Sequence, residues 1–168
     1  MFLRKFCFIA FFFLLSIYTF AQNNIENDIG WAIAYLSKPV PSDFKKLGNE
    51  WDTMSLLEDN LSGDLYIKDG DPIWFLYVQD DIVICTQIWY LHTNIINTIT
   101  LLNDYIRFFV YYEWKFSEQK QTENTFAYVN KNEILILCKG PLVIDKYTCL
   151  SITFTNEKIR RKYGQILK

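Results

Sequence analysis

The chain has 168 residues, of which 51% are hydrophobic, 18% aromatic and 21% charged, and its formal net charge is −2. This length is typical of one domain with a single buried core, and the composition excludes a disordered chain and a collagen-like filament. The slightly negative net charge gives no support for a nucleic-acid-binding protein, which usually carries a basic surface.

The first 21 residues have the three zones of a secretory signal peptide. Arg4 and Lys5 form a basic start, an apolar run follows from Phe6, and Ala21 precedes polar Gln22. The alternative is a retained membrane anchor, but the apolar run is shorter than the about 20 residues that span a bilayer. We therefore expect a signal peptide over 1–21 and a single α+β domain over 22–168. The protein would be exported, to the periplasm or outside the cell, and the abundant Asn, Ile, Lys and Tyr favour a bacterial envelope.

The domain begins with a pattern typical of an amphipathic helix. Apolar residues recur at helical spacing, at Ile25, Ile29, Ala32, Ile33 and Leu36. Pro39 and Pro41 would end this helix, and Ser42 offers the N-cap of a second short helix that stops at Gly48. A further short helix over 52–59 is an alternative to loop structure.

From Leu61 onward the pattern changes to strands. Leu65 to Lys68 precedes a turn at residues 69–72, and the runs Ile73 to Val78 and Ile82 to Leu91 flank a polar break. Two β-branched and aromatic runs around such a break predict a hairpin. Both runs are apolar on both faces, so we expect them to be central in a sheet or covered on each side.

Residues 93–109 carry the clearest helical pattern in the chain. Ile95, Ile99, Leu102, Ile106 and Phe109 fall on one stripe, which we expect to face the core. Alternation predicts strands over 112–116 and 148–154, and the runs 125–129 and 133–139 predict a second hairpin. The tail from Glu157 is basic and weakly helical.

These elements predict an α+β fold. We expect a predominantly antiparallel sheet of about six to seven strands, with N-terminal helices and one central amphipathic helix packed on one face. The order of helix then strands occurs twice, which is consistent with a divergent duplication.

Few residues point to catalysis. His92 is the only histidine, and we expect it to close a strand-to-helix turn rather than to act as a base. Ser42 and Lys45 match the short S-x-x-K pattern of serine acyl-enzymes, but the pattern arises easily by chance, its companion motifs are missing, and a helix cap at Ser42 is the better explanation. The carboxylates at 69–71 and 80–81 have the composition of turns and lack calcium-loop spacing. We therefore predict no catalytic residue, no metal site and no cofactor.

Three cysteines remain after removal of the signal peptide: Cys85, Cys138 and Cys149. An exported protein can hold disulfides, and a hairpin could place Cys138 opposite Cys149. A disulfide between these two is one hypothesis, and three buried thiols are the alternative.

The aromatic residues are the one pointer to function. Trp74, Trp89 and Tyr90 lie on strands that are apolar on both faces, so they are candidates for a partner groove or a ligand pocket. The sequence favours a small, non-catalytic, exported binding module, such as an inhibitor, an immunity-type protein or an envelope assembly factor. Its partner would be another protein or an apolar ligand. The alternatives are an apolar-ligand carrier and a small envelope hydrolase.

Overall fold

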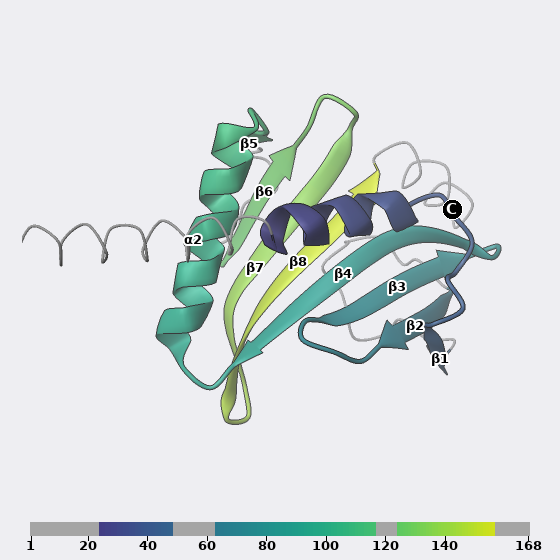
Figure 1. Cartoon of the computed structure of the whole chain (residues 1–168), viewed down its shortest axis with the longest axis horizontal. Coiled ribbons are helices and arrows are strands. Elements are labelled where there is room, and N and C mark those ends of the chain that lie inside the picture. The colour runs from purple at the N-terminus through teal and green to yellow at the C-terminus, as the bar shows by residue number, and fades with distance from the viewer. Residues whose placement is uncertain (1–23, 49–62, 117–123, 157–168) are drawn as a thin grey trace, which may run out of the picture.

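The structure is a computed structural model that describes residues 24–48, 63–116 and 124–156. It contains an eight-stranded antiparallel sheet and two helices, so the α+β prediction is confirmed, with slightly more strands than expected (Figure 1). The expected signal peptide, the short helix over 52–59 and the basic tail lie outside the described residues.

The N-terminal helix spans residues 24–35 and confirms the first predicted helix. Its buried stripe is Ile25, Ile29 and Ala32, and Leu36, directly after the helix, is buried as well. The second helix predicted from Ser42 is wrong, because residues 45–48 form strand β1 (Lys45–Gly48) and pair with the neighbouring strand. The few residues between Pro41 and Gly48 are too short a segment to nucleate a helix against that pairing.

The first four strands form a meander. They are β1, β2 (Asp64–Lys68), β3 (Ile73–Gln79) and β4 (Ile82–His92), each antiparallel to the next. Asp80 and Asp81 join β3 to β4 with positive φ at both positions, the conformation that a two-residue hairpin turn requires. The carboxylates at 80–81 therefore serve a turn, as expected.

Helix α2 (Ile95–Tyr111) follows β4 and is capped by Asn94, whose side chain accepts a hydrogen bond from the Ile96 amide. Its buried residues are Thr98, Leu102, Tyr105, Phe108 and Phe109. The predicted core stripe is thus only partly right: Leu102 and Phe109 are buried, whereas Ile95 and Ile99 are exposed. The larger rings of Tyr105 and Phe108 fill the space over the sheet instead.

The last four strands form a second meander: β5 (Lys115–Phe116), β6 (Thr125–Val129), β7 (Ile134–Ile144) and β8 (Tyr147–Asn156). The strand order is β1-β2-β3-β4-β8-β7-β6-β5, so β4 and β8 meet in the centre. Each half of the chain is one helix followed by four antiparallel strands, and the two halves are arranged symmetrically about the β4–β8 pair. This symmetry is what a divergent duplication would produce.

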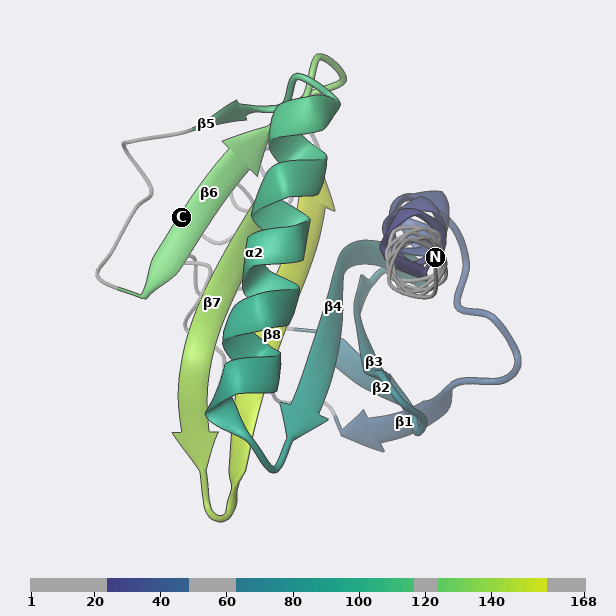
Figure 2. The ribbon, with the colours of Figure 1, turned by 60° about the vertical axis from the view of Figure 1, so that its left-hand side comes forward.

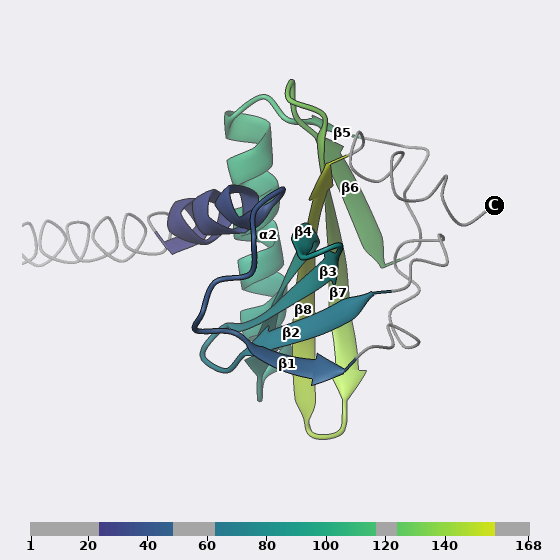
Figure 3. The ribbon, with the colours of Figure 1, turned by 90° about the vertical axis from the view of Figure 1, so that its right-hand side faces the viewer.

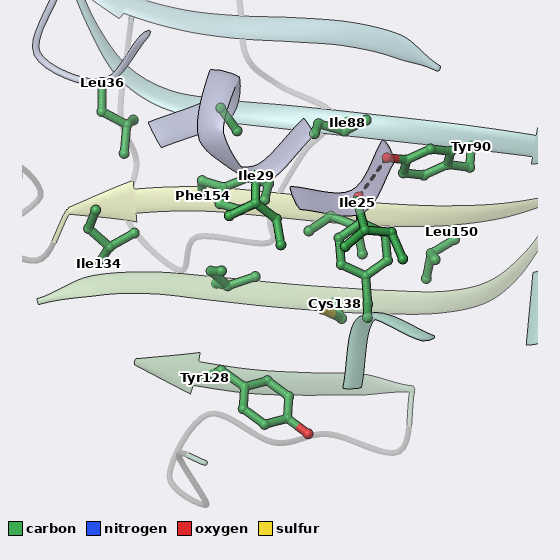
Figure 4. Close-up of a cluster of buried hydrophobic side chains, with 14 of the residues drawn as sticks. Ile25, Ile29, Leu36, Ile88, Tyr90, Tyr128, Ile134, Cys138, Leu150 and Phe154 are labelled. Carbon is green, nitrogen blue, oxygen red and sulfur yellow. Dashed lines mark hydrogen bonds between the residues drawn. The ribbon is translucent and has the colours of Figure 1, made fainter. Parts of the chain in front are cut away.

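Both helices lie on one side of the sheet, which we call the helix face (Figure 3). α2 lies over β7 and β8, and the N-terminal helix lies over β4 (Figure 2). The main core fills this space, with Ile88, Leu150, Ile152 and Phe154 fully buried among the side chains from both helices (Figure 4).

The opposite side of the sheet, the far face, is also buried. Phe75, Tyr77 and Cys85 form one apolar cluster there, and Ala127, Leu135 and Leu137 form another. Between the two clusters, the side-chain amide nitrogen of Gln87 donates to the hydroxyls of Ser151 (2.9 Å) and Thr153 (3.1 Å). The Tyr77 hydroxyl donates to the side-chain amide oxygen of Gln87 (2.9 Å). Burial on both faces confirms the expectation for β3 and β4, and it leaves little open surface on the far face.

Candidate functional site

The structure does not bring the three predicted site residues together. Trp74 and Tyr90 point to the helix face, where both join the main core cluster. On β4, Trp89 shares the far face with Gln87 and Leu91, the residues two positions before and after it. Alternation along a strand separates Trp89 from Tyr90, so the three residues cannot line one pocket.

Tyr90 belongs to a buried hydrogen-bond chain. Its hydroxyl donates to Asp28 Oδ2 of the N-terminal helix at 2.5 Å and lies 2.6 Å from the Tyr105 hydroxyl of α2. Because a phenol has one proton, Tyr105 must donate to Tyr90. Burial raises the pKa of Asp28, and the hydrogen bond from Tyr90 partly offsets this. The chain joins β4 to both helices, so Tyr90 acts here as a structural residue.

Trp89 packs against Phe75, with ring centroids 5.1 Å apart, and faces Ser151 across the β4–β8 pair. Its indole nitrogen is buried and has no hydrogen-bond partner among the residues that the structure describes. The ring therefore contributes chiefly apolar contact to the far face.

Trp74 lies in a second group of rings, which reaches the surface. It packs edge-on against Tyr35 (centroids 6.0 Å, 86° between ring planes), and Phe44 packs against the same tyrosine (5.6 Å, 79°). Trp31 stacks beside Tyr35 (6.1 Å, 28°) and is 59% exposed. We call Trp31, Tyr35, Phe44 and Trp74 the aromatic platform.

An ion pair borders the aromatic platform. Lys68 Nζ lies 2.7 Å from Asp43 Oδ2 and 5.8 Å from the centroid of the Phe44 ring. The hydrogen bond from Lys68 lowers the pKa of Asp43 and raises that of Lys68. Burial raises the pKa of Tyr35, the nearby Lys68 charge lowers it in part, and the Asp43 charge raises it further. The platform therefore has one exposed ring, Trp31, and is bordered by an ion pair whose two charges cancel.

Sequence reasoning found Trp74 of this platform but missed its other members. The signal for Trp31 was its position on the helix: it lies off the stripe of Ile25, Ile29 and Ala32 that faces the core. A tryptophan at such a position is exposed unless another element covers it.

His92 closes the strand-to-helix turn. Its Nδ1 lies 3.0 Å from Thr98 Oγ1, which lies 2.7 Å from Thr148 Oγ1, and Thr148 donates to the His92 carbonyl (3.3 Å). With the Thr148 proton used in that bond, Thr98 donates to Thr148 and the Nδ1–H of His92 donates to Thr98. The ring is held by a structural network, as expected.

Other candidate chemistry is dispersed. Ser42 and Lys45 are both exposed, Ser42 in a turn and Lys45 on β1. Within the described ranges, no group of three or more His, Cys, Asp or Glu side chains is placed to hold a metal ion. Among the same residues, no helix has the length and apolarity needed to cross a bilayer.

The three described cysteines are buried free thiols. Cys138 faces Ile152 across the β7–β8 pair and belongs to the core on the helix face. Cys149 faces Leu142 on β7. Its neighbour Leu150 belongs to the core on the helix face, so the Cys149 side chain points to the far face. The Cys138–Cys149 disulfide is not formed in this fold, because β7 continues to Ile144 before the chain turns, which places Cys138 opposite Ile152, three residues along β8 from Cys149.

A second exposed apolar surface runs along one edge of α2. Its residues are Ile95, Ile96, Ile99 and Val110, of which Ile96 is 65% exposed. This edge is aliphatic and carries no charged residue before Asp104. It differs in chemistry from the aromatic platform.

Compared with protein families, curated proteins and solved structures, the chain matches none. Its function must be argued from its own side chains.

Proposed function

We propose that this chain is an exported, non-catalytic binding module that holds its ligand or partner on the aromatic platform. The observation that carries the proposal is the exposure of Trp31 beside half-buried Tyr35 and Trp74. Tryptophan and tyrosine contribute the most energy per residue at binding surfaces, because they bury a large area and lose few rotamers. Core packing alone does not explain an exposed indole in this position.

Binding is favoured over hydrolysis by the placement of polar groups. The half-buried Asp28 and His92 are each used in hydrogen bonds that join elements of the fold. The polar groups beside the exposed rings, Asp43 and Lys68, neutralise one another. Such a pair can orient a ligand, but neither group is poised as an acid or a base.

A capture experiment tests the proposal. The tagged protein is used to capture its ligand from the envelope of the cells that produce it, alongside Trp31→Ala, Ile96→Asn and Tyr111→Ala. Tyr111 is a matched control, because it is 73% exposed but lies at the end of α2. We expect the captured species to be lost with Trp31→Ala and retained with the other two variants. Loss with Ile96→Asn and retention with Trp31→Ala would assign binding to α2 and contradict the proposal.

Export is tested separately by the mass of the envelope form. We expect a mature chain that begins at Gln22, because the peptidase should cut after Ala21. A chain that retains Met1 would contradict cleavage.

A further inference from the structure

Helix α2 carries a second, mostly apolar stripe beside the one that it buries in the core. Successive members of this stripe are three, four, three and four residues apart: Ile96, Ile99, Asn103, Ile106 and Val110. At 3.6 residues per turn, these positions lie on one side of the helix. Alternating spacings of three and four are the pattern by which two helices pair along an apolar seam. We call these five residues the α2 stripe.

The α2 stripe is open to solvent along its length. Ile96 and Val110, at its two ends, are 65% and 66% exposed, and Ile99 is 41% exposed. Asn103 in the middle is exposed as well, and the remaining member is half-buried. At 1.5 Å per residue, the stripe is about 21 Å long. It is therefore a continuous exposed surface that the packing of α2 on the sheet does not use.

One residue of β7 widens this surface near the start of α2. Val143 is 75% exposed and pairs with Thr148 in the β7–β8 hairpin. The Thr148 hydroxyl lies 2.7 Å from that of Thr98 on α2, so Thr148 points to the helix face. Residues directly opposite on paired strands point to the same side, so Val143 also faces that side, where α2 begins (Figure 2). The exposed apolar surface thus continues from the helix onto the hairpin.

The α2 stripe is nearly symmetrical about Asn103. Ile96 and Val110 lie seven residues before and after it, and Ile99 and Ile106 lie four before and three after. When two copies of a protein meet about a two-fold axis, the same patch faces itself and must be complementary to itself. A two-fold axis beside Asn103 meets this condition, because branched aliphatic side chains then face branched aliphatic side chains.

The polar and charged groups of α2 favour the same partner. An asparagine amide both donates and accepts, so the Asn103 of a second copy can satisfy it within an otherwise apolar contact. A single asparagine at an inward position fixes the register and the number of helices in a coiled coil. The stripe itself carries no charge, and Arg107 beside it is paired with Asp104 of the same helix (3.6 Å). Two copies therefore meet without like-charge repulsion.

We propose that two copies of this chain form a symmetric dimer through the α2 stripe, with Asn103 of one copy beside Asn103 of the other. A small apolar ligand fits less well, because such ligands bind in concave sites and the outer side of a helix is convex. A lipid surface also fits less well, because it attracts helices rich in Lys and Arg, and Arg107 is the one basic residue of α2. A different protein would require no symmetry about Asn103.

The dimer contact shares no residue with the aromatic platform, so it neither requires nor excludes the proposed function. The platform rings come from the N-terminal helix, β3 and Phe44. Tyr105, which takes part in the hydrogen-bond chain to the N-terminal helix, lies on the opposite side of α2 from the stripe. Two copies joined by the stripe therefore leave both platforms free.

Sedimentation equilibrium of the purified envelope form tests the dimer. We expect a monomer–dimer equilibrium with a dissociation constant between about 1 µM and 1 mM, because a contact of about two heptads is small for a specific interface. Ile99→Lys should raise that constant by at least about tenfold, since each copy would then place an ammonium in the apolar contact. Asn97→Lys is the matched control, because Asn97 is exposed on the same helix but outside the stripe, and it should leave the constant unchanged. Circular dichroism verifies that both variants fold.

Cysteine cross-linking then locates the contact. Mild oxidation with copper phenanthroline should join two copies of Asn103→Cys by a disulfide, because the two residues meet at the axis. Asn97→Cys should not cross-link, and the three described native thiols are buried. A protein that stays monomeric at about 1 mM would overturn the proposal. So would a dimer that Ile99→Lys leaves intact, or cross-linking through residue 97 in place of 103.

Discussion

The hydroxyl of Tyr90 lies 2.6 Å from the hydroxyl of Tyr105, deep in the core between β4 and α2. Tyr105 is fully buried, and the Tyr90 hydroxyl donates a hydrogen bond to Asp28 of the N-terminal helix. This chain connects three elements through groups that would be unpaired without it. A buried polar chain of this kind is favourable only while every member is satisfied.

Tyr90→Phe should therefore destabilise the protein by about 1–3 kcal/mol, because Tyr105 loses its acceptor and Asp28 loses its donor in a buried environment. Urea unfolding measures the effect. Tyr111→Phe is the matched control, since that ring is exposed, and it should change stability by less than about 0.5 kcal/mol. Equal effects of the two substitutions would mean that the hydrogen bonds of Tyr90 contribute nothing to stability.

The hydrogen-bond chain from Tyr105 through Tyr90 to Asp28 also makes the stability of the protein depend on pH. Burial raises the pKa of Asp28 in the folded state above its ordinary value, so folding favours the protonated carboxyl. The stabilisation that results from the raised pKa of Asp28 is fully present below the unfolded-state pKa and is lost as the pH rises through the higher folded-state pKa. Asp28→Asn removes this titration, so its stability relative to the original protein should rise as the pH is raised from below the ordinary aspartate pKa through the higher folded-state pKa. Urea unfolding at several pH values measures the difference, and a constant or falling difference would contradict the direction of the shift.

Much of the fold followed from local pattern. The helix at 24–35, the β3–β4 hairpin and the β6–β7 hairpin were predictable, because periodicity and turn composition are local properties. The segment at Ser42 was not, because its state depends on pairing of Lys45 and Lys46 with β2, which is remote in sequence. The separation of Cys138 from Cys149 was not predictable either, because it depends on where the hairpin turns: β7 continues past Cys138 to Ile144, so Cys138 faces Ile152.

The candidate site was less predictable than the fold. Trp74 was found because aromatic residues on strands are conspicuous, but the sequence could not show that it points away from Trp89 and toward Tyr35. The platform combines the N-terminal helix, Phe44 and β3, and the ion pair that borders it adds Asp43 and β2. Only tertiary packing brings these segments together.

Gly140 and Gly30 should respond oppositely to substitution by alanine. A Cβ at Gly140 would lie 2.9 Å from the Cys149 carbonyl oxygen and 3.3 Å from the Leu150 Cα, both backbone atoms of β8. Gly140→Ala should therefore destabilise the protein by about 1–3 kcal/mol, because neither strand can move without disturbing the sheet. Gly30→Ala, in the open surface of a helix, should stabilise it by about 0.5–1 kcal/mol. Thermal unfolding of both variants checks the signs, and destabilisation by Gly30→Ala would show that its open side is covered in solution.

The three described thiols should react slowly and in a defined order. Cys85, Cys138 and Cys149 are buried, and burial raises the pKa of all three. That of Cys149 rises to about 11, less than the other two. Because the thiolate is the reactive form, Cys149 should react first with an alkylating reagent near neutral pH. Mass spectrometry of the form lacking residues 1–21 should find all three thiols alkylated in denaturant without reductant. Recovery of only one alkylated thiol under those conditions would restore a disulfide and require a different register between β7 and β8.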